Sequence, residues 1–265
     1  MPEAAEVALI GLGVVSGGMT LVWAASLIPR DVGVVDVFWS LGFVLLAWLY
    51  RALFDFPQSE RAVLVPILVT VWGVRLALHL ARRWWRADEE DHRYAAMRRK
   101  RGGSFWWRSL YVVFWSQAAL LWVVAMPLLQ IQRVARPVEL GWLDWVGIVV
   151  FAIGFVFESV GDYQLQRFKS DPANDGEVMD EGLWRYTRHP NYFGDAMVWW
   201  GLSLMALATP GSVWVLVGTA VMTLLLLRVS GVALLERDIA ERRPEYEAYK
   251  RRTNAFFPWL PSSEA

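Results

Sequence analysis

The sequence predicts an all-α integral membrane protein with seven transmembrane helices. Hydrophobic residues make up 56% of the 265 positions. Apolar stretches of about 20 residues recur along the chain, and that length crosses a hydrocarbon core of about 30 Å. Backbone N–H and C=O groups need partners inside lipid, and the alternating pattern of a β-barrel strand is absent from these stretches. We therefore expect each stretch to be a helix.

Seven apolar runs are bounded by polar or charged positions and qualify as spans. Their ranges are 7–28, 32–53, 62–80, 109–130, 141–160, 192–208 and 212–235. The first run lacks a preceding basic segment and is too long for a cleaved signal peptide. No internal repeat and no separate soluble segment stands out. The sequence predicts a single seven-helix membrane domain over residues 1–265, in which 182–265 holds the most informative block and the polar tail.

Basic residues predict the orientation of the spans. Lys and Arg are concentrated in the segment after the third span, in the segment after the fifth span and in the tail after the seventh span. Short loops rich in Lys and Arg stay in the cytoplasm. We therefore expect the N-terminus outside, the C-terminus in the cytoplasm, and a location in the bacterial inner membrane with any cofactor site facing the cytoplasm.

Composition excludes several function classes. The chain has 26 basic and 26 acidic residues, so it lacks the bulk positive charge of a nucleic-acid-binding protein, and no nucleic acid is expected as a partner. It has no cysteine, which excludes disulfides and thiolate metal sites. His79, His92 and His189 lie on different segments without metal-ligand spacing, so no metal site is predicted.

The block at 182–195 leads into the sixth span and carries the clearest chemistry. Pro190 has the position of a first-turn proline, which places His189 at the helix N-terminus, where free N–H groups favour anions. Arg185 and Arg188 add planar donors that suit phosphate. These residues are candidates for a cofactor site. The structural alternative is a capped helix whose basic residues only fix the membrane orientation.

Further polar positions share helix faces near the cytoplasmic side. Asn191, Asp195 and Trp199 follow one another at intervals of four residues, and they present an amide, a carboxylate and an indole to a nucleotide cofactor. Arg228 and Glu236 are eight residues apart and lie roughly on one face at the end of the seventh span. Arg228 either snorkels to the interface or binds an anionic group.

The fifth span carries a second polar face. Glu158 and Asp162 are i and i+4 near its cytoplasmic end, and Lys169 follows Asp162 by one heptad. A carboxylate within a span is expensive and indicates function. Ribose hydroxyls are natural partners for such carboxylates. Glu158 is also close enough to the interface to be merely hydrated.

A third set lies on the second and third spans. Asp36 lies just inside the basic boundary of the second span, and Arg75 and His79 share one face of the third. A desolvated Asp keeps a proton near neutral pH, and His also donates there. Asp36 and His79 are therefore candidate proton donors to a substrate carbonyl. The structural alternative is an Asp36–Arg75 ion pair that ties the two helices together.

The block Gly-Leu-Trp-Arg-Tyr-Thr-Arg-His-Pro-Asn-Tyr-Phe-Gly-Asp at 182–195 resembles the signature of the steroid 5-alpha-reductase family, in its bacterial branch. Shorter blocks from the second span to the tail support this resemblance. They are Asp-Val-Phe-Trp-Ser at 36–40, Arg-Leu-Ala-Leu-His-Leu at 75–80, Glu-Asp-His-Arg-Tyr at 90–94, Asp-Tyr-Gln-Leu at 162–165, Arg-Val-Ser-Gly-Val-Ala-Leu-Leu-Glu at 228–236 and Tyr-Lys-Arg-Arg-Thr-Asn-Ala-Phe-Phe-Pro-Trp at 249–259.

The resemblance implies a membrane oxidoreductase of lipid and steroid metabolism. Such an enzyme binds NADPH on the cytoplasmic side and reduces the C4–C5 double bond of 3-oxo-Δ4-steroids or similar lipophilic enones that arrive from the membrane lipid. Asp36 falls where the family places a Glu that bonds the steroid 3-ketone, and His79 falls near its substrate-facing Tyr. The positions that match cofactor contacts of the family are Arg93, Glu158, Asp162, Lys169, Asn191, Asp195, Trp199, Arg228 and Glu236.

Two other functions stay open. The first is an S-adenosylmethionine-dependent methyltransferase like the isoprenylcysteine carboxyl group, because residues 188–194 fit the signatures of both families. The Gly-Leu-Trp start at 182 and the Asn after Pro190 favour the reductase. The second is a lipid- or sterol-binding protein without catalysis. The clustering of polar positions near the cytoplasmic ends of five spans argues against it.

Overall fold

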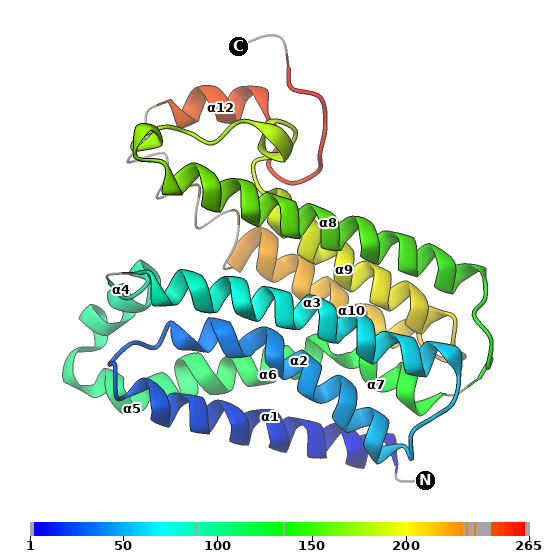
Figure 1. Cartoon of the computed structure of the whole chain (residues 1–265). Coiled ribbons are helices and arrows are strands. Elements are labelled where there is room, and N and C mark those ends of the chain that lie inside the picture. The colour runs from blue at the N-terminus through cyan, green and yellow to red at the C-terminus, as the bar shows by residue number, and fades with distance from the viewer. Residues whose placement is uncertain are drawn as a thin grey trace. The chain divides into compact units, whose positions relative to one another are not determined.

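The computed structural model describes residues 3–87, 89–134, 136–229, 232, 236 and 245–262. All regular structure in these residues is helical, and they contain no strand (Figure 1). This confirms the all-α class. The chain divides into two compact units. Unit 1 comprises Met1–Leu140 with Ala206–Gly218, and unit 2 comprises Gly141–Met205 with Thr219–Ala265. Each unit is described by itself below.

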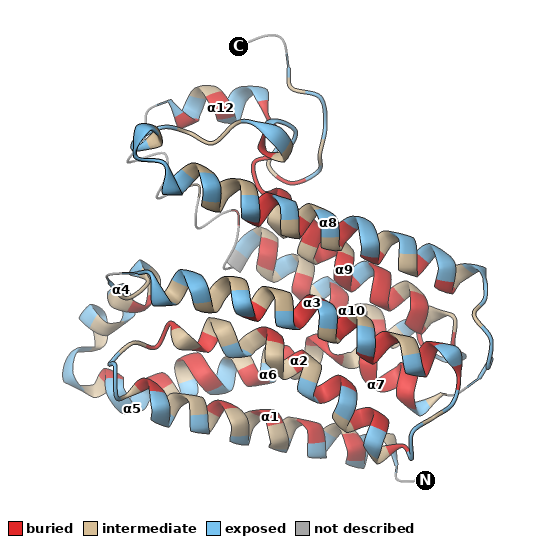
Figure 2. Cartoon of the chain, viewed as in Figure 1, coloured by how far each residue is buried: buried red, intermediate tan, exposed pale blue. Residues whose placement is uncertain are grey.

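Unit 1 is built on three long helices, in which α1 packs on α2 and α2 packs on α3. The aromatic pair Phe43 and Trp72 joins α2 to α3 with ring centroids 5.9 Å apart, and both side chains are fully buried. Figure 2 shows buried positions along the facing sides of these helices. The helices of the unit are α1 (Ala4–Ser26), α2 (Val34–Leu53), α3 (Glu60–Trp85), α4 (His92–Arg101), α5 (Phe105–Ser109), α6 (Ser116–Val124) and α7 (Met126–Arg133), with short helical turns at η1 (Gly102–Ser104) and η5 (Val213–Val215).

The fourth predicted span, 109–130, is not one straight helix. A π-helical turn, η2 (Leu110–Trp115), interrupts its first half. The helix then breaks at Ala125, and the two parts are bent by 44°. Pro127 lies in the first turn of α7, and a proline there has no N–H to continue the preceding helix. The break therefore follows directly from the sequence.

Unit 2 is organised by α8 (Trp142–Ser170) and α9 (Pro190–Leu207), which pack along a line of glycines. Gly147 faces Gly201, and a Cβ built on either lies 2.6–2.7 Å from the other's carbonyl oxygen. Gly154 faces Gly194 in the same way, at 2.6 Å. No ordinary Cβ fits at such distances, so only glycine allows the two backbones to approach this closely. We call this contact the glycine seam.

The opposite side of α8 is apolar and exposed. Trp145, Val149, Ile153, Val156 and Val160 recur every three or four residues, and between 36% and 59% of each is exposed. A continuous apolar stripe of this kind on a long helix is typical of a surface in contact with lipid. The glycine seam and this stripe therefore divide α8 into a packing face and a lipid face.

The remaining elements of unit 2 are short. They are η3 (Pro172–Asn174), η4 (Gly182–Arg185), α10 (Leu216–Leu224, whose first three residues belong to unit 1), η6 (Leu225–Val229) and α12 (Tyr246–Arg252). Residues 230, 231 and 233–235, at the end of the seventh predicted span, lie outside the described residues. So do residues 237–244 of the tail.

The described helices support an integral membrane protein, with fewer long spans than the sequence predicts. Four helices, α1, α2, α3 and α8, are long and apolar enough to cross a membrane, and the bent stretch 92–133 makes a fifth if it counts as one span. The range 192–208 and the described part of 212–235 are helical, but these helices are shorter or less apolar than the other spans. Seven spans and the predicted orientation therefore stay predictions.

The glycine seam yields a first prediction. Gly154→Ala places a methyl group 2.6 Å from the Gly194 carbonyl oxygen, so α9 must move away from α8. We expect the free energy of unfolding in detergent to fall by about 1–3 kcal/mol, the usual cost of overpacking. The unfolding midpoint, followed by tryptophan fluorescence, should fall by about 2–4 °C for each kcal/mol. Gly13→Ala is the matched control, because no described atom lies within 4 Å of a Cβ there. Equal midpoints for both variants would contradict the role of the seam.

Candidate functional site

The glycine seam ends beside a group of polar side chains from α8 and α9. Gly161, one heptad after Gly154, approaches the start of α9. A Cβ built on Gly161 would lie 3.2 Å from the backbone nitrogen of Asn191. Asn191 Nδ2 donates to Asp162 Oδ1 at 3.1 Å. Asp162 and Glu158 are 7% and 3% exposed. The seam thus buries two carboxylates next to an amide, at the end of a candidate membrane span.

A second group of side chains lies directly before α9. Arg188 Nε donates to Glu236 Oε1 at 2.8 Å, and Arg188 Nη2 donates to Glu236 Oε2 at 3.1 Å. His189 Nε2 lies 3.2 Å from Glu236 Oε1. The side chain of Arg188 is 8% exposed and that of His189 is 4% exposed. Glu236 therefore forms a largely buried, bidentate ion pair with Arg188, and it also contacts His189.

Burial and pairing set the protonation states of this group. Burial acts to raise the pKa of Glu236, but hydrogen bonds from His189 and Arg188 outweigh it and hold the pKa at about 2. Burial lowers the pKa of His189 below its ordinary value, and the adjacent Glu236 offsets only part of this. At neutral pH, Glu236 is therefore ionised and His189 is neutral. Because Glu236 can only accept, the proton of His189 lies on Nε2 and the lone pair on Nδ1.

The C-terminal segment completes this group. Arg188 Nη1 donates to the carbonyl oxygens of Lys250, at 2.9 Å, and Thr253, at 2.5 Å. Thr187 Oγ1 donates to the Phe256 carbonyl oxygen at 2.9 Å. The Tyr249 hydroxyl donates to the Trp184 carbonyl oxygen. Four of the five N–H groups of Arg188 are thus used inside unit 2, where they tie the start of α9 to the tail.

Unit 1 contains a separate polar network around Asp36. Arg93 Nη2 donates to Asp36 Oδ2 at 2.9 Å, and the Tyr94 hydroxyl donates to Asp36 Oδ1 at 2.7 Å. Gln117 Nε2 donates to the Tyr94 hydroxyl at 3.3 Å. Arg93 also donates to Asp91, from Nε to Oδ1 at 2.9 Å and from Nη2 to Oδ2 at 3.1 Å. The ion-pair partner of Asp36 is therefore Arg93 rather than Arg75.

The other residues predicted for the site are spread over both units. His79 is half-buried on α3 in unit 1. In unit 2, Trp199 is fully buried and Asp195 is half-buried on α9. Lys169, Arg185 and Arg228 are exposed. The structure thus gathers Asp162 with Asn191, Arg188 with His189 and Glu236, and Asp36 with Arg93.

Several residues of these groups were not predicted. Tyr94, Gln117 and Asp91 complete the network of Asp36, yet nothing in the spacing of 91, 94 and 117 links them to position 36. The glycine seam did have a signal. The glycines of α8 recur at intervals of seven, at 147, 154 and 161, and those of α9 at 194 and 201. Small residues at that interval mark one helix face.

The chain is similar to one protein family and to relatives named as methyltransferases. The family model described as "Protein of unknown function (DUF1295)" matches residues 22–253. Methanethiol S-methyltransferase 1 of Bradyrhizobium diazoefficiens is 25% identical over 86% of this chain and 79% of its own length. Probable O-methyltransferase ustE of Ustilaginoidea virens is 38% identical over 68 residues, which are 26% of this chain and 23% of the relative.

A third relative, Uncharacterized protein C594.04c of Schizosaccharomyces pombe, is 24% identical over 92% of this chain and 77% of its own length. No solved structure matches the chain.

These matches overturn the reductase prediction. The steroid 5-alpha-reductase resemblance was wrong, and the oxidoreductase activity, NADPH and the steroid substrate fall with it, because the named relatives are methyltransferases. The physical reason lies in the 188–194 block. Arg188 binds Glu236 and the tail, and Pro190 begins α9. Such a block specifies a local architecture that two enzyme classes share, rather than the chemistry of either. The predicted role of Asp36 and His79 as donors to a steroid ketone is therefore withdrawn as well.

The ionisation of Glu236 and His189 yields a prediction for stability against pH. Because the folded-state pKa of Glu236 is lowered from 4.5 to about 2, its stabilisation is complete above pH 4.5 and is lost as the pH falls towards 2. His189 stays neutral when folded, so the unfolding midpoint also falls as the pH drops below 6.5. We expect Glu236→Gln to cost about 3 kcal/mol at pH 7 and progressively less below pH 4.5.

The matched control is Glu247→Gln. The Glu247 side chain is 51% exposed and pairs with Lys250 at 3.4 Å, so its loss should change stability by less than about 0.5 kcal/mol. A difference between Glu236→Gln and wild type that stays constant from pH 7 to pH 3 would contradict the assigned ionisation.

Proposed function

We propose that this chain, which belongs to the DUF1295 family, is a membrane-embedded methyltransferase that moves a methyl group from S-adenosylmethionine to the sulfur of a thiol. The observation that carries the proposal is the similarity to a methanethiol S-methyltransferase along 86% of the chain. The similarity to a probable O-methyltransferase supports the same enzyme class over a shorter region.

The buried polar side chains of unit 2 suit S-adenosylmethionine better than NADPH. The sulfonium and ammonium groups are positive and the ribose offers two hydroxyls, and carboxylates suit all of these groups. The end of the glycine seam carries the buried carboxylates Glu158 and Asp162 beside Asn191. A pyrophosphate placed there would meet like charge. Arg188 is the buried cation nearest in sequence to Asn191, and it already donates four N–H groups to partners inside unit 2.

We propose specific roles for the residues of this site. Asp162 and Asn191 bind the ribose, Glu158 binds a positive group of the cofactor, and the Arg188–Glu236 pair fixes the start of α9. Trp199, fully buried on α9, helps to exclude water. The remaining proposed cofactor contacts of unit 2 are Lys169, Arg185, His189, Asp195 and Arg228. Arg93 belongs to unit 1 and binds Asp36 there.

The mechanism needs an electrophilic methyl group, which bound S-adenosylmethionine supplies, and a thiolate to attack it. The thiol must therefore lose its proton. Neutral His189 donates from Nε2 to Glu236, so its Nδ1 carries the free lone pair. We propose that Nδ1 of His189 takes the thiol proton and that Glu236 holds the imidazole in this tautomer. Burial keeps the imidazole neutral and ready to act as a base.

The topology completes the proposal. We propose seven spans in one membrane domain, with the N-terminus outside and the site on the cytoplasmic side of the bacterial inner membrane. The basic segments after the third, fifth and seventh predicted spans support this orientation. A lipophilic or small volatile thiol reaches such a site through the membrane lipid.

Ligand-dependent stability tests the function. Saturating S-adenosylmethionine should raise the unfolding midpoint of the detergent-purified protein, because a ligand at 100 times its Kd adds about 2.7 kcal/mol. NADPH should not raise it. Asp162→Ala should weaken binding of S-adenosylmethionine about tenfold or more, since it removes a charge-assisted hydrogen bond. Asp175→Asn, in an exposed loop of the same unit, should bind as wild type does. Stabilisation by NADPH alone would overturn the assignment.

A further inference from the structure

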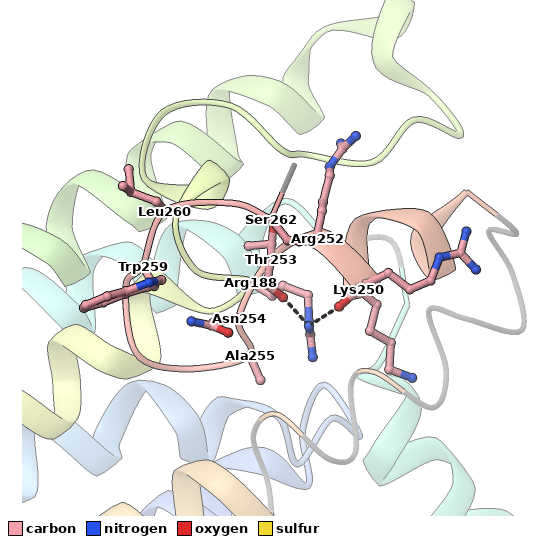
Figure 3. Close-up of a pocket in the computed structure, with 10 residues that line it drawn as sticks. Arg188, Lys250, Arg252, Thr253, Asn254, Ala255, Trp259, Leu260 and Ser262 are labelled. Carbon is pink, nitrogen blue, oxygen red and sulfur yellow. Dashed lines mark hydrogen bonds between the residues drawn. The ribbon is translucent and has the colours of Figure 1, made fainter. Parts of the chain in front are cut away.

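Unit 2 has a pocket of about 390 Å³ that the proposed reaction does not use (Figure 3). It is formed by the end of α12 and the loop that follows, residues 253–262, which we call the C-terminal hook. Its lining combines basic, polar and apolar side chains. The lining residues are Arg188, Lys250, Arg251, Arg252, Thr253, Asn254, Ala255, Trp259, Leu260 and Ser262.

Three cations border this pocket. The Arg188 guanidinium turns inward to the carbonyl oxygens of Lys250 and Thr253 (Figure 3), so the charges available to a ligand belong to Lys250, Arg251 and Arg252. Lys250 pairs with Glu247 at 3.4 Å, and Arg252 pairs with Asp180. Both pairs are 38–51% exposed. Exposed pairs contribute little to stability, so an incoming anion replaces them at small cost.

The rim of the pocket is apolar and held in place. Phe257, Trp259 and Leu260 are 69%, 72% and 75% exposed. The backbone that carries them is fixed on both sides. Arg188 N donates to the Asn254 carbonyl oxygen, Trp259 N donates to the Tyr186 carbonyl oxygen and Ser262 N donates to the Arg252 carbonyl oxygen, each at 2.9 Å. The fold thus presents three large apolar side chains to the outside on a hydrogen-bonded loop.

The hook is attached near the end of α8, a candidate membrane span. It is bonded to the segment 184–188, and Trp184 Nε1 donates to the carbonyl oxygen of Gly161 near the end of α8. Tyr163, on α8 two residues later, is 61% exposed. Since α8 is long and apolar enough to cross a membrane, its last turns and the hook reach the region where aromatic residues gather.

We propose that the C-terminal hook is a binding site for an anionic phospholipid of the adjacent leaflet. The Lys250 and Arg252 side chains point away from each other (Figure 3), so the basic end of α12 attracts anionic headgroups as a cluster of charges. Phe257, Trp259 and Leu260 enter the boundary between headgroups and acyl chains. Apolar insertion beside basic charge is the combination by which peripheral segments bind anionic bilayers. The proposal does not depend on the reaction that the protein catalyses.

A single-cysteine label tests this site, because the sequence contains no cysteine. Leu260→Cys, labelled with bimane, is reconstituted in nanodiscs of phosphatidylglycerol or phosphatidylcholine whose acyl chains are brominated. We expect quenching in phosphatidylglycerol well above that in phosphatidylcholine. Adding Lys250→Gln and Arg251→Gln should lower the insertion equilibrium in phosphatidylglycerol about fivefold for each charge removed.

Asp175→Cys with the same label is the matched control, since Asp175 is an exposed residue of a polar loop in the same unit. Its quenching should be low in both lipids. Equal quenching at 260 and 175 would overturn the insertion of the hook. Quenching at 260 that is the same in both lipids and unchanged by the two charge-removing substitutions would overturn recognition of the anionic phosphate.

Discussion

The close approach of α8 and α9 is the constraint on which the rest of unit 2 depends. Backbones meet at Gly147 with Gly201 and at Gly154 with Gly194, and no other residue type leaves room for that contact. The same packing carries Gly161 to the start of α9, where Asn191 meets Asp162. Glu158 lies on this face of α8 and becomes buried with it. The grouping of Glu158, Asp162 and Asn191 therefore follows from glycines that recur every seven residues.

Charge pairing then fixes the start of α9 against the tail. A zero net charge on a largely apolar chain suggests little by itself. The structure pairs acids and bases that are buried or partly buried, Glu236 with Arg188 and His189 in one unit and Asp36 with Arg93 in the other. A buried charge without such a partner is costly. In the proposed enzyme Glu236 holds His189, whose imidazole burial keeps neutral.

Local features of the fold followed from the sequence, and long-range ones did not. Apolar run length predicted helical structure in the expected ranges as far as the structure describes them, and Pro190 marked the start of α9, because both depend on neighbouring residues. The partner of Asp36 was missed because Arg93 and Tyr94 lie more than fifty positions away. The reductase was preferred wrongly over the methyltransferase alternative, which the named relatives support. The block 188–194 describes how Arg188 and Pro190 shape a helix start, and that shape is shared by enzymes with different cofactors.

The central claim, methyl transfer to sulfur, is tested most directly by following the methyl group itself. The purified protein in nanodiscs is incubated with S-adenosylmethionine that carries a trideuterated methyl group and with a small alkanethiol, and the products are identified by mass spectrometry. The account predicts the trideuteromethyl thioether and S-adenosylhomocysteine in equal amounts, and no product from Asp162→Ala. Absence of the thioether from wild-type protein that binds S-adenosylmethionine would contradict it.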